Sequence, residues 1–150
     1  MQVIGLLLAI VVGVSDGDTV TALTHDKTQM KVRLSGIDAP ESRQPFGQRS
    51  KQHLSDLVYG KEVDLTCNKV DRYKRHICLI RVDGKDANLE QIKAGMAWHY
   101  KAYEREQGAA ERVLYSVEEV KAKNASKGLW REPDPVPPWE WRKEQRKPRK

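Results

Sequence analysis

The chain has 150 residues, of which 39% are hydrophobic and 32% are charged. This length suits one domain with a single core, and this composition excludes a chain built mainly of membrane spans. The formal net charge is +6, and the tail, residues 142–150, carries six positive and one negative side chains. Removing that +5 leaves the body, residues 1–141, at +1. A basic tail on a near-neutral body is compatible with a polyanionic partner such as nucleic acid; a solvated, disordered end is the alternative.

The first residues form an apolar segment, residues 1–10, that resembles the hydrophobic part of a signal peptide. No basic residue precedes it, no clear cleavage site follows, and it is too short to span a bilayer. Residues 11–14 also have the character of a first strand. The segment therefore merges into that strand, and the sequence does not decide whether residues 1–10 are cleaved off.

The pattern after residue 8 predicts five strands in mostly antiparallel order, with a helix between the third and fourth. The predicted strands are 11–14, 19–23, 30–34, 62–67 and 77–82. The predicted helices are one with Leu54, Leu57 and Val58 on its apolar face, one with Leu89, Ile92 and Met96 that Asp86 or Asn88 caps, and one over 104–127 with Val113, Val117 and Val120 on one side. This is a mainly β domain with helices (α+β) over residues 8–130: a five-stranded OB-fold Greek-key barrel with three α-helices.

A proline- and tryptophan-rich extension with a basic tail follows at residues 131–150. We expect residues 133–138 to be extended, because prolines stiffen them, and Trp139 and Trp141 to pack against the body. The tail should add non-specific affinity for a polyanion and contribute little to a chemical step.

Two cysteines, Cys67 and Cys78, flank a short polar segment between two predicted strands. If this is a hairpin, the two sulfurs lie opposite one another, and a disulfide would stabilise the fold by roughly 2–3 kcal/mol. Two buried thiols are the alternative. A disulfide would indicate an oxidising compartment.

The stretch from Arg33 to Glu41 (RLSGIDAPE) gathers one guanidinium and two carboxylates within nine residues. Pro40 stiffens the backbone between Asp38 and Glu41. The first predicted turn contributes Asp16 and Asp18, which are turn residues or metal ligands. Because three strands in a meander return to the first hairpin, Asp18 could lie close to Asp38.

Asp18, Asp38 and Glu41 are hard oxygen ligands, which favour calcium or magnesium over zinc. The four histidines (His25, His53, His76 and His99) are scattered and form no ligand spacing. Carboxylates that hold a cation, beside arginines that grip phosphate oxygens, suit the cleavage of a phosphodiester.

Three segments together resemble the signature segments of the staphylococcal nuclease (thermonuclease) family: Asp16-Gly17-Asp18-Thr19-Val20, Arg33-Leu34 with Ile37-Asp38-Ala39-Pro40-Glu41, and Asp71-Arg72-Tyr73-Lys74-Arg75. They occur in the family's order with similar spacing, and the match covers roughly residues 8–130. The resemblance implies an OB-fold and a calcium-dependent phosphodiesterase that acts on DNA and RNA and leaves a 3′-phosphate.

The resemblance also implies roles for individual residues. One calcium ion would be held by Asp18, Asp38 and the backbone carbonyl of Ala39. Glu41 would orient or deprotonate the attacking water, and Arg33 and Arg75 would bind the scissile phosphate. Substrate contacts are expected from Tyr73, Lys74, Tyr100 and Tyr103.

The sequence departs from the family pattern at three places. Ala39 stands where the founding member has a threonine, Lys74 stands where a glycine often precedes the second arginine, and the loop at 42–47 is shorter and lacks a lysine-rich stretch. None of these removes a charged group that the mechanism needs.

We therefore expect an active endonuclease with little sequence specificity that favours single-stranded DNA and RNA, works as a monomer without an obligate protein partner, and is secreted or periplasmic. A cytoplasmic location is the alternative. The rival functions are a non-catalytic OB-fold module that binds nucleic acid or protein, and a membrane-tethered interaction protein that uses the apolar N-terminus.

Overall fold

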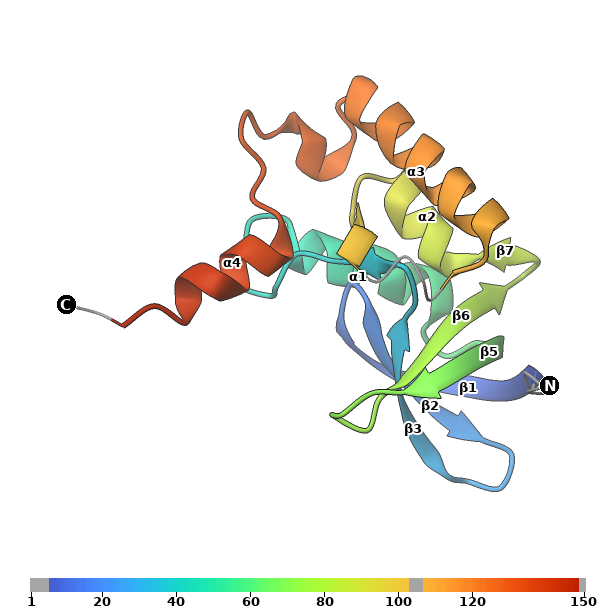
Figure 1. Cartoon of the computed structure of the whole chain (residues 1–150). Coiled ribbons are helices and arrows are strands. Elements are labelled where there is room, and N and C mark those ends of the chain that lie inside the picture. The colour runs from blue at the N-terminus through green and yellow to red at the C-terminus, as the bar shows by residue number, and fades with distance from the viewer. Residues whose placement is uncertain (1–5, 103–106, 149–150) are drawn as a thin grey trace.

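The computed structural model describes residues 6–102 and 107–148 and contains a closed barrel of five strands (Figure 1). The strands in the described residues are Leu6–Asp16 (β1), Thr19–Thr24 (β2), Gln29–Leu34 (β3), Ile37–Asp38 (β4), Glu62–Val70 (β5), His76–Val82 (β6), Lys85–Asp86 (β7) and Trp98–His99 (β8). The main sheet has the order β3-β2-β1-β5-β6-β7, and a parallel pairing of β3 with β6 closes it. The predicted OB-fold is confirmed.

The alternating strands bury one face each, as their sequence pattern requires. Val20 and Ala22 of β2 and Val32 and Leu34 of β3 are fully buried in the barrel core. The first strand begins earlier than predicted, because residues 6–10 pair with β5. The apolar N-terminal run is thus, from residue 6 onward, part of the barrel wall.

The β5 and β6 hairpin places Cys67 directly opposite Cys78, and the structure joins them by a disulfide. This bond lies on the two strands that lead to the 71–75 turn, so it links the supports of that turn covalently.

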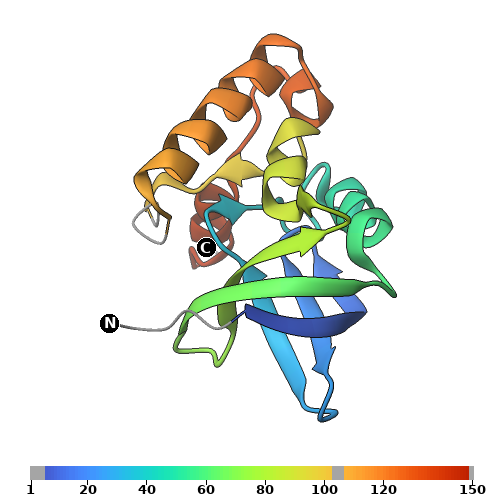
Figure 2. The same ribbon diagram turned by 90° about the vertical axis from the view of Figure 1, so that its right-hand side faces the viewer.

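The described helices are Gly47–Val58 (α1), Ala87–Lys93 (α2), Ala109–Asn124 (α3) and Pro138–Gln145 (α4), with a short 3-10 helix at Gly128–Arg131 (η2). Asp86 caps α2 by accepting a 2.8 Å hydrogen bond from the Leu89 N–H. Figure 2 shows α2 and α3 packed side by side above the barrel. In the part of the chain that the structure describes, no helix is long and apolar enough to cross a membrane.

The side of α3 that carries Val113, Val117 and Val120 faces solvent rather than the core. The buried residues of α3 include Tyr115 and Glu119. Tyr115 donates a hydrogen bond to Asp86 and Glu119 accepts one from the His99 N–H, so polar contacts rather than valine packing orient this helix.

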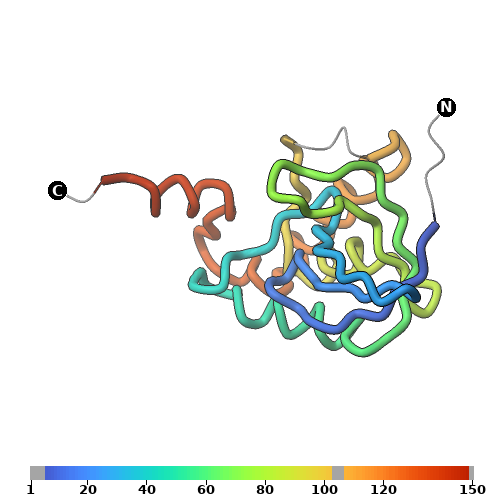
Figure 3. Tube along the Cα trace, turned by 90° about the horizontal axis from the view of Figure 1, so that it is seen from below, coloured from blue at the N-terminus to red at the C-terminus, as the bar shows by residue number. Residues whose placement is uncertain are grey.

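The fourth helix, α4, was not predicted, since three α-helices were expected; the two-residue strands β4, β7 and β8 and the short helix η2 were not predicted either. It starts with Pro138 in the first turn, where a proline loses no hydrogen bond. Trp139 stacks on Tyr100 with ring centroids 5.3 Å apart and meets Trp98 edge-on at 5.5 Å. Gln44 also donates to the carbonyl of Val136. These contacts hold the start of α4 against the body, while its far end extends away from the barrel (Figure 3).

Candidate active site

The turn between β1 and β2 places Asp18 against the backbone of the 36–41 segment. Asp18 accepts hydrogen bonds from the Ala39 N–H at 2.8 Å and from the Thr19 hydroxyl at 2.9 Å. A Cβ atom on Gly17 would lie 2.9 Å from the Ala39 Cβ and 1.8 Å from the Ser50 Oγ. Only glycine lets the turn approach this closely, so Gly17 sets the position of Asp18.

Arg33, at the end of β3, lies between the two aspartates. Its guanidinium is 3.3 Å from Asp38 and 3.7 Å from Asp18. It also donates to the carbonyls of Leu34 and Ile37, at 3.0 Å and 2.9 Å. These contacts fix the guanidinium, and they bring Asp18 and Asp38 to one cation although 20 positions separate them in the sequence.

Glu41 and Asp38 share a second guanidinium, that of Arg142 on α4. Arg142 donates to Glu41 at 2.7 Å and to both carboxylate oxygens of Asp38, at 2.7 Å and 3.2 Å. The bond to Asp38 is bidentate, the strongest arrangement available to an arginine and a carboxylate.

Burial and repulsion from neighbouring carboxylates raise the pKa values of Asp38 and Asp16. Burial, opposed by Arg142 and reinforced by Asp18, raises the pKa of Asp38 to about 6. Burial, then the charges of Asp18 and Glu41, raise the pKa of Asp16. The Arg142 pKa is raised by its hydrogen bonds and charge interactions with Asp38 and Glu41, although burial opposes this. The acids are crowded enough that a positive charge beside them is strongly favoured.

The β5–β6 hairpin forms one wall of the site and carries Arg75. Asp71 accepts hydrogen bonds from the Arg75 Nε at 2.8 Å and from the Tyr73 and Arg75 N–H groups, both at 2.9 Å. Arg75 also lies over the Tyr73 ring, 5.4 Å from its centroid. Burial tends to raise the Asp71 pKa, but the hydrogen bonds and charge of Arg75 lower it overall. Lys74 adopts a positive φ of 64°, which explains why a glycine suits this position.

These groups line one open cleft of about 950 Å³. Its lining residues are Asp16, Asp18, Thr19, Lys31, Arg33, Asp38, Glu41, Lys69, Val70, Asp71, Arg72, Tyr73, Arg75, Ile77, Tyr100, Trp139, Arg142 and Arg146. The acids come from the strand ends, and the basic side chains come mainly from β3, the hairpin and α4. Such a cleft suits a polyanion whose phosphate must come close to carboxylates.

The donor set also suits a hard cation. Asp18 and Asp38 approach one another around Arg33, and the backbone of Ala39 bonds to Asp18. Among the described residues, no group of three or more histidine, cysteine, aspartate or glutamate side chains could hold a metal ion. An ion held by Asp18, Asp38 and the Ala39 carbonyl would have an all-oxygen ligand set completed by water, which is typical of calcium or magnesium.

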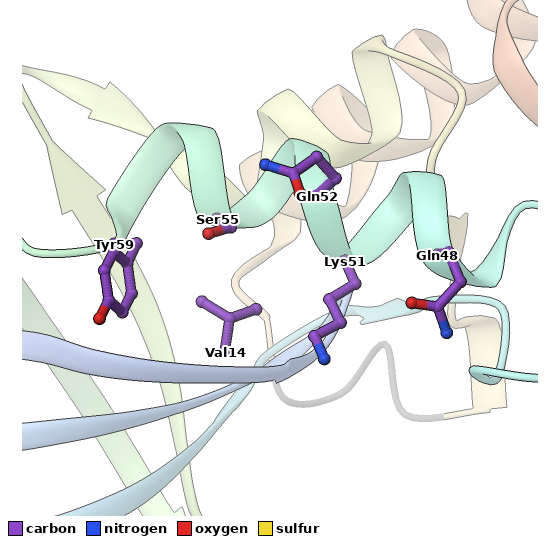
Figure 4. Close-up of a pocket in the computed structure, with 6 residues that line it drawn as sticks. All are labelled: Val14, Gln48, Lys51, Gln52, Ser55 and Tyr59. Carbon is purple, nitrogen blue, oxygen red and sulfur yellow. The ribbon is translucent and has the colours of Figure 1, made fainter.

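A second, smaller hollow lies between β1 and α1 (Figure 4). It is lined by Val14, Gln48, Lys51, Gln52, Ser55 and Tyr59. It contains one charged side chain and no carboxylate, so it lacks the groups that phosphodiester chemistry requires.

A family model described as "Staphylococcal nuclease homologue" matches residues 31–132, more than half of the chain. The chain belongs to the staphylococcal nuclease family. An "Uncharacterized endonuclease" of Haemophilus influenzae is 43% identical over 91% of this chain and 73% of its own length. A "Micrococcal nuclease" of Shigella flexneri is 39% identical over 89% of this chain and 79% of its own length. An "Uncharacterized endonuclease" of Escherichia coli O157:H7 is 38% identical over 88% and 82%.

Most of the site residues that the family resemblance predicts line this cleft. Arg33, Glu41, Arg75, Asp18 and Asp38 all line it, and Ala39 lies next to Asp38. Tyr73 and Tyr100 line it too, whereas the exposed Lys74 is absent from its lining, and Tyr103 lies outside the described residues.

Sequence reasoning missed Arg142, which touches two of the acids. A signal for it exists in the spacing of Trp139, Arg142 and Arg146. Residues three and seven positions apart share one helix face, and all three line the cleft. That signal required a helix, and the prolines before it argued for an extended chain.

Proposed function

We propose that the protein is a calcium-dependent endonuclease that hydrolyses phosphodiester bonds of DNA and RNA with little sequence specificity and leaves 3′-phosphate ends. The observation that carries the proposal is one cleft in which Asp18 and Asp38 pair with Arg33, Glu41 lies beside Asp38 on Arg142, and Arg75 lies on the hairpin wall. Membership of the staphylococcal nuclease family and relatives named as nucleases support it.

Arg33 and Arg75 bind the non-bridging oxygens of the scissile phosphate and stabilise the charge that develops on them. Arg33 is held by backbone carbonyls and Arg75 by Asp71, so both guanidiniums are positioned before the substrate arrives. Little reorganisation is then needed in the transition state. Backbone-directed binding of this kind carries no sequence information, which supports low sequence specificity.

Glu41 is the general base. It takes one proton from the attacking water while the water oxygen bonds to phosphorus, and the bond from phosphorus to the 5′ oxygen breaks. The leaving 5′ oxygen is protonated from solvent, and the phosphate stays on the 3′ side. Glu41 is half-buried and its backbone N–H binds Gln44 at 3.1 Å, so the start of the loop that carries it is fixed.

Asp18, Asp38 and the Ala39 carbonyl would hold the calcium ion. When bound, that ion neutralises the acids and polarises the phosphate. This chain's own residues supply the rest: Gly17 seats the Asp18 turn, and the pairing of Ile37–Asp38 with Trp98–His99 fixes the Asp38 backbone.

We further propose a monomer that favours single strands and works outside the cytoplasm. The open cleft and the exposed Tyr73 ring support contacts with unpaired bases. The Cys67–Cys78 disulfide supports an oxidising compartment.

The test is digestion of single-stranded DNA by wild type and Glu41→Gln, each with calcium and with a chelator. We expect cleavage that needs calcium and falls by about 10²–10⁴-fold in Glu41→Gln. Mapping of the product ends checks the 3′-phosphate. Wild type that binds DNA without cutting it would instead favour a non-catalytic binding module.

A further inference from the structure

The helix α4 presents one continuous face to the cleft. Trp139, Arg142 and Arg146 all line it, and they lie on the same side of the helix because of their spacing. Trp139 anchors this face on Tyr100. An aromatic anchor followed by two arginines on one face suits a strand of phosphates rather than an apolar partner.

The opposite wall of the cleft is the β5–β6 hairpin, which contributes Lys69, Arg72, Tyr73 and Arg75. Figure 1 shows the tip of the β5–β6 hairpin and α4 on the same side of the barrel. The acids thus form the floor, and basic groups stand on both sides of it. A nucleic-acid strand lying over the acids would meet both walls.

The position of Arg142 is informative because its partners are the acids themselves. Its guanidinium occupies both oxygens of Asp38 and one oxygen of Glu41. A cation bound to Asp38 would repel this guanidinium, and a general base must be free to accept a proton. Arg33 is also held by two backbone carbonyls, whereas Arg142 donates to the acids themselves. We therefore expect Arg142 to leave these carboxylates when the site is loaded and to bind a substrate phosphate in the same cleft.

We propose that α4 is a substrate-binding wall of the active site and that Arg142 is a phosphate ligand which occupies the acids until cation and substrate arrive. This inference rests on the proposed function and extends it to an element outside the residues that the family model matches. It replaces the expectation that the tail contributes only diffuse charge: Arg142 acts from one defined place, whereas Lys143 next to it is exposed and lies outside the cleft lining.

The first experiment measures binding rather than cleavage, so that it is independent of turnover. A labelled single-stranded oligonucleotide is titrated with calcium present in the Glu41→Gln background, which leaves it intact, and anisotropy is recorded. Adding Arg142→Ala should weaken binding by about tenfold or more, because a charge-assisted bond to phosphate is lost. Arg142→Lys should be intermediate, since it keeps the charge but not the bidentate geometry.

The matched control is Lys143→Ala, which removes the same charge from the same helix. Its effect should stay within about twofold at moderate salt, where exposed charges are screened. Equal losses for Arg142→Ala and Lys143→Ala, or no loss for either, would overturn the proposal. If DNA binding depends on Arg142 but wild type never cleaves, the substrate-binding role of α4 is supported and the proposed nuclease function is wrong.

The second experiment titrates the protein with calcium by calorimetry in the absence of nucleic acid. Arg142→Ala should bind calcium about fivefold or more tightly, because the competing guanidinium is gone. Unchanged calcium affinity would overturn the proposed competition at Asp38. Faster cleavage by Arg142→Ala than by wild type would also overturn the proposal, since α4 would then be an inhibitory strap.

Discussion

Arg75 and Arg142 lie on opposite walls of one cleft, but they are held in different ways. Arg75 pairs with Asp71, four residues before it, within a single turn. Arg142 pairs with Glu41 and Asp38, 101 and 104 residues away in the sequence. Arg75 is held by a nearby acceptor, Asp71, whereas Arg142 is held by Asp38 and Glu41.

This difference predicts how each arginine would interact with a substrate phosphate. In the proposed mechanism Arg75 would keep Asp71 as its partner when substrate arrives, because Asp71 is not one of the proposed catalytic acids. Arg142 would exchange carboxylates for phosphate, so its proposed contribution to binding would depend on the cation. Variants on the two walls of the cleft distinguish these two ways of holding an arginine.

Arg75→Ala should lower kcat on single-stranded DNA by about 10²–10³-fold, because it removes a preorganised donor to the developing charge. Steady-state kinetics with calcium measures this. Lys74→Gly, which removes an exposed charge from the same turn at a position outside the cleft lining, is the control. Comparable losses in both variants would show that general charge, rather than the Asp71-held geometry, carries the effect.

Loss of the disulfide should weaken the hairpin wall. The double variant Cys67→Ala/Cys78→Ala should lose about 2–3 kcal/mol of unfolding free energy, because the unfolded chain regains the entropy of an open loop. Urea denaturation monitored by circular dichroism gives the value. An unchanged denaturation midpoint would show that the strand pairing alone maintains the wall.

Trp139→Ala should loosen the other wall. Removing the stack on Tyr100 and the edge contact with Trp98 should cost about 1–2 kcal/mol of unfolding free energy. The affinity for the oligonucleotide should also fall, as we expect for Arg142→Ala. The reason is that the helix carrying Arg142 is then no longer held on Tyr100. Trp139→Phe, which keeps a ring at this position, serves as the control, and wild-type affinity in Trp139→Ala would count against the anchoring role.

Lys74→Gly should have the smallest effect. The residue has φ of 64°, where a side chain costs about 1 kcal/mol, so glycine should leave stability equal or slightly higher. Activity should stay near wild type, because Lys74 does not line the cleft. A thermal melt and one kinetic assay suffice, and a loss of activity would reveal a role for the lysine that its position does not explain.

Much of the site was readable from local sequence. Asp16-Gly17-Asp18 between alternating strands predicts a tight hairpin, and the 33–41 stretch predicts acids beside an arginine, because period-two strands and glycine turns are short-range features. The Asp86 cap and the β5–β6 hairpin are local for the same reason. The side of α3 that faces the core was not readable, since the buried Tyr115 and Glu119 depend on partners in Asp86 and His99.

The barrel, the acids, Arg33 and Arg75 could be predicted from the sequence, because each depends on neighbours within a few residues or on a pattern that strand pairing preserves. The tertiary structure alone decided that the tail begins as α4 and that Arg142 reaches Asp38 and Glu41. That contact requires Trp139 to pack on Tyr100, a match between distant surfaces that no local pattern encodes. Pro137 stays extended and the helix begins only at Pro138, so long-range packing of α4 against the body, rather than a local pattern, fixes where Arg142 lies.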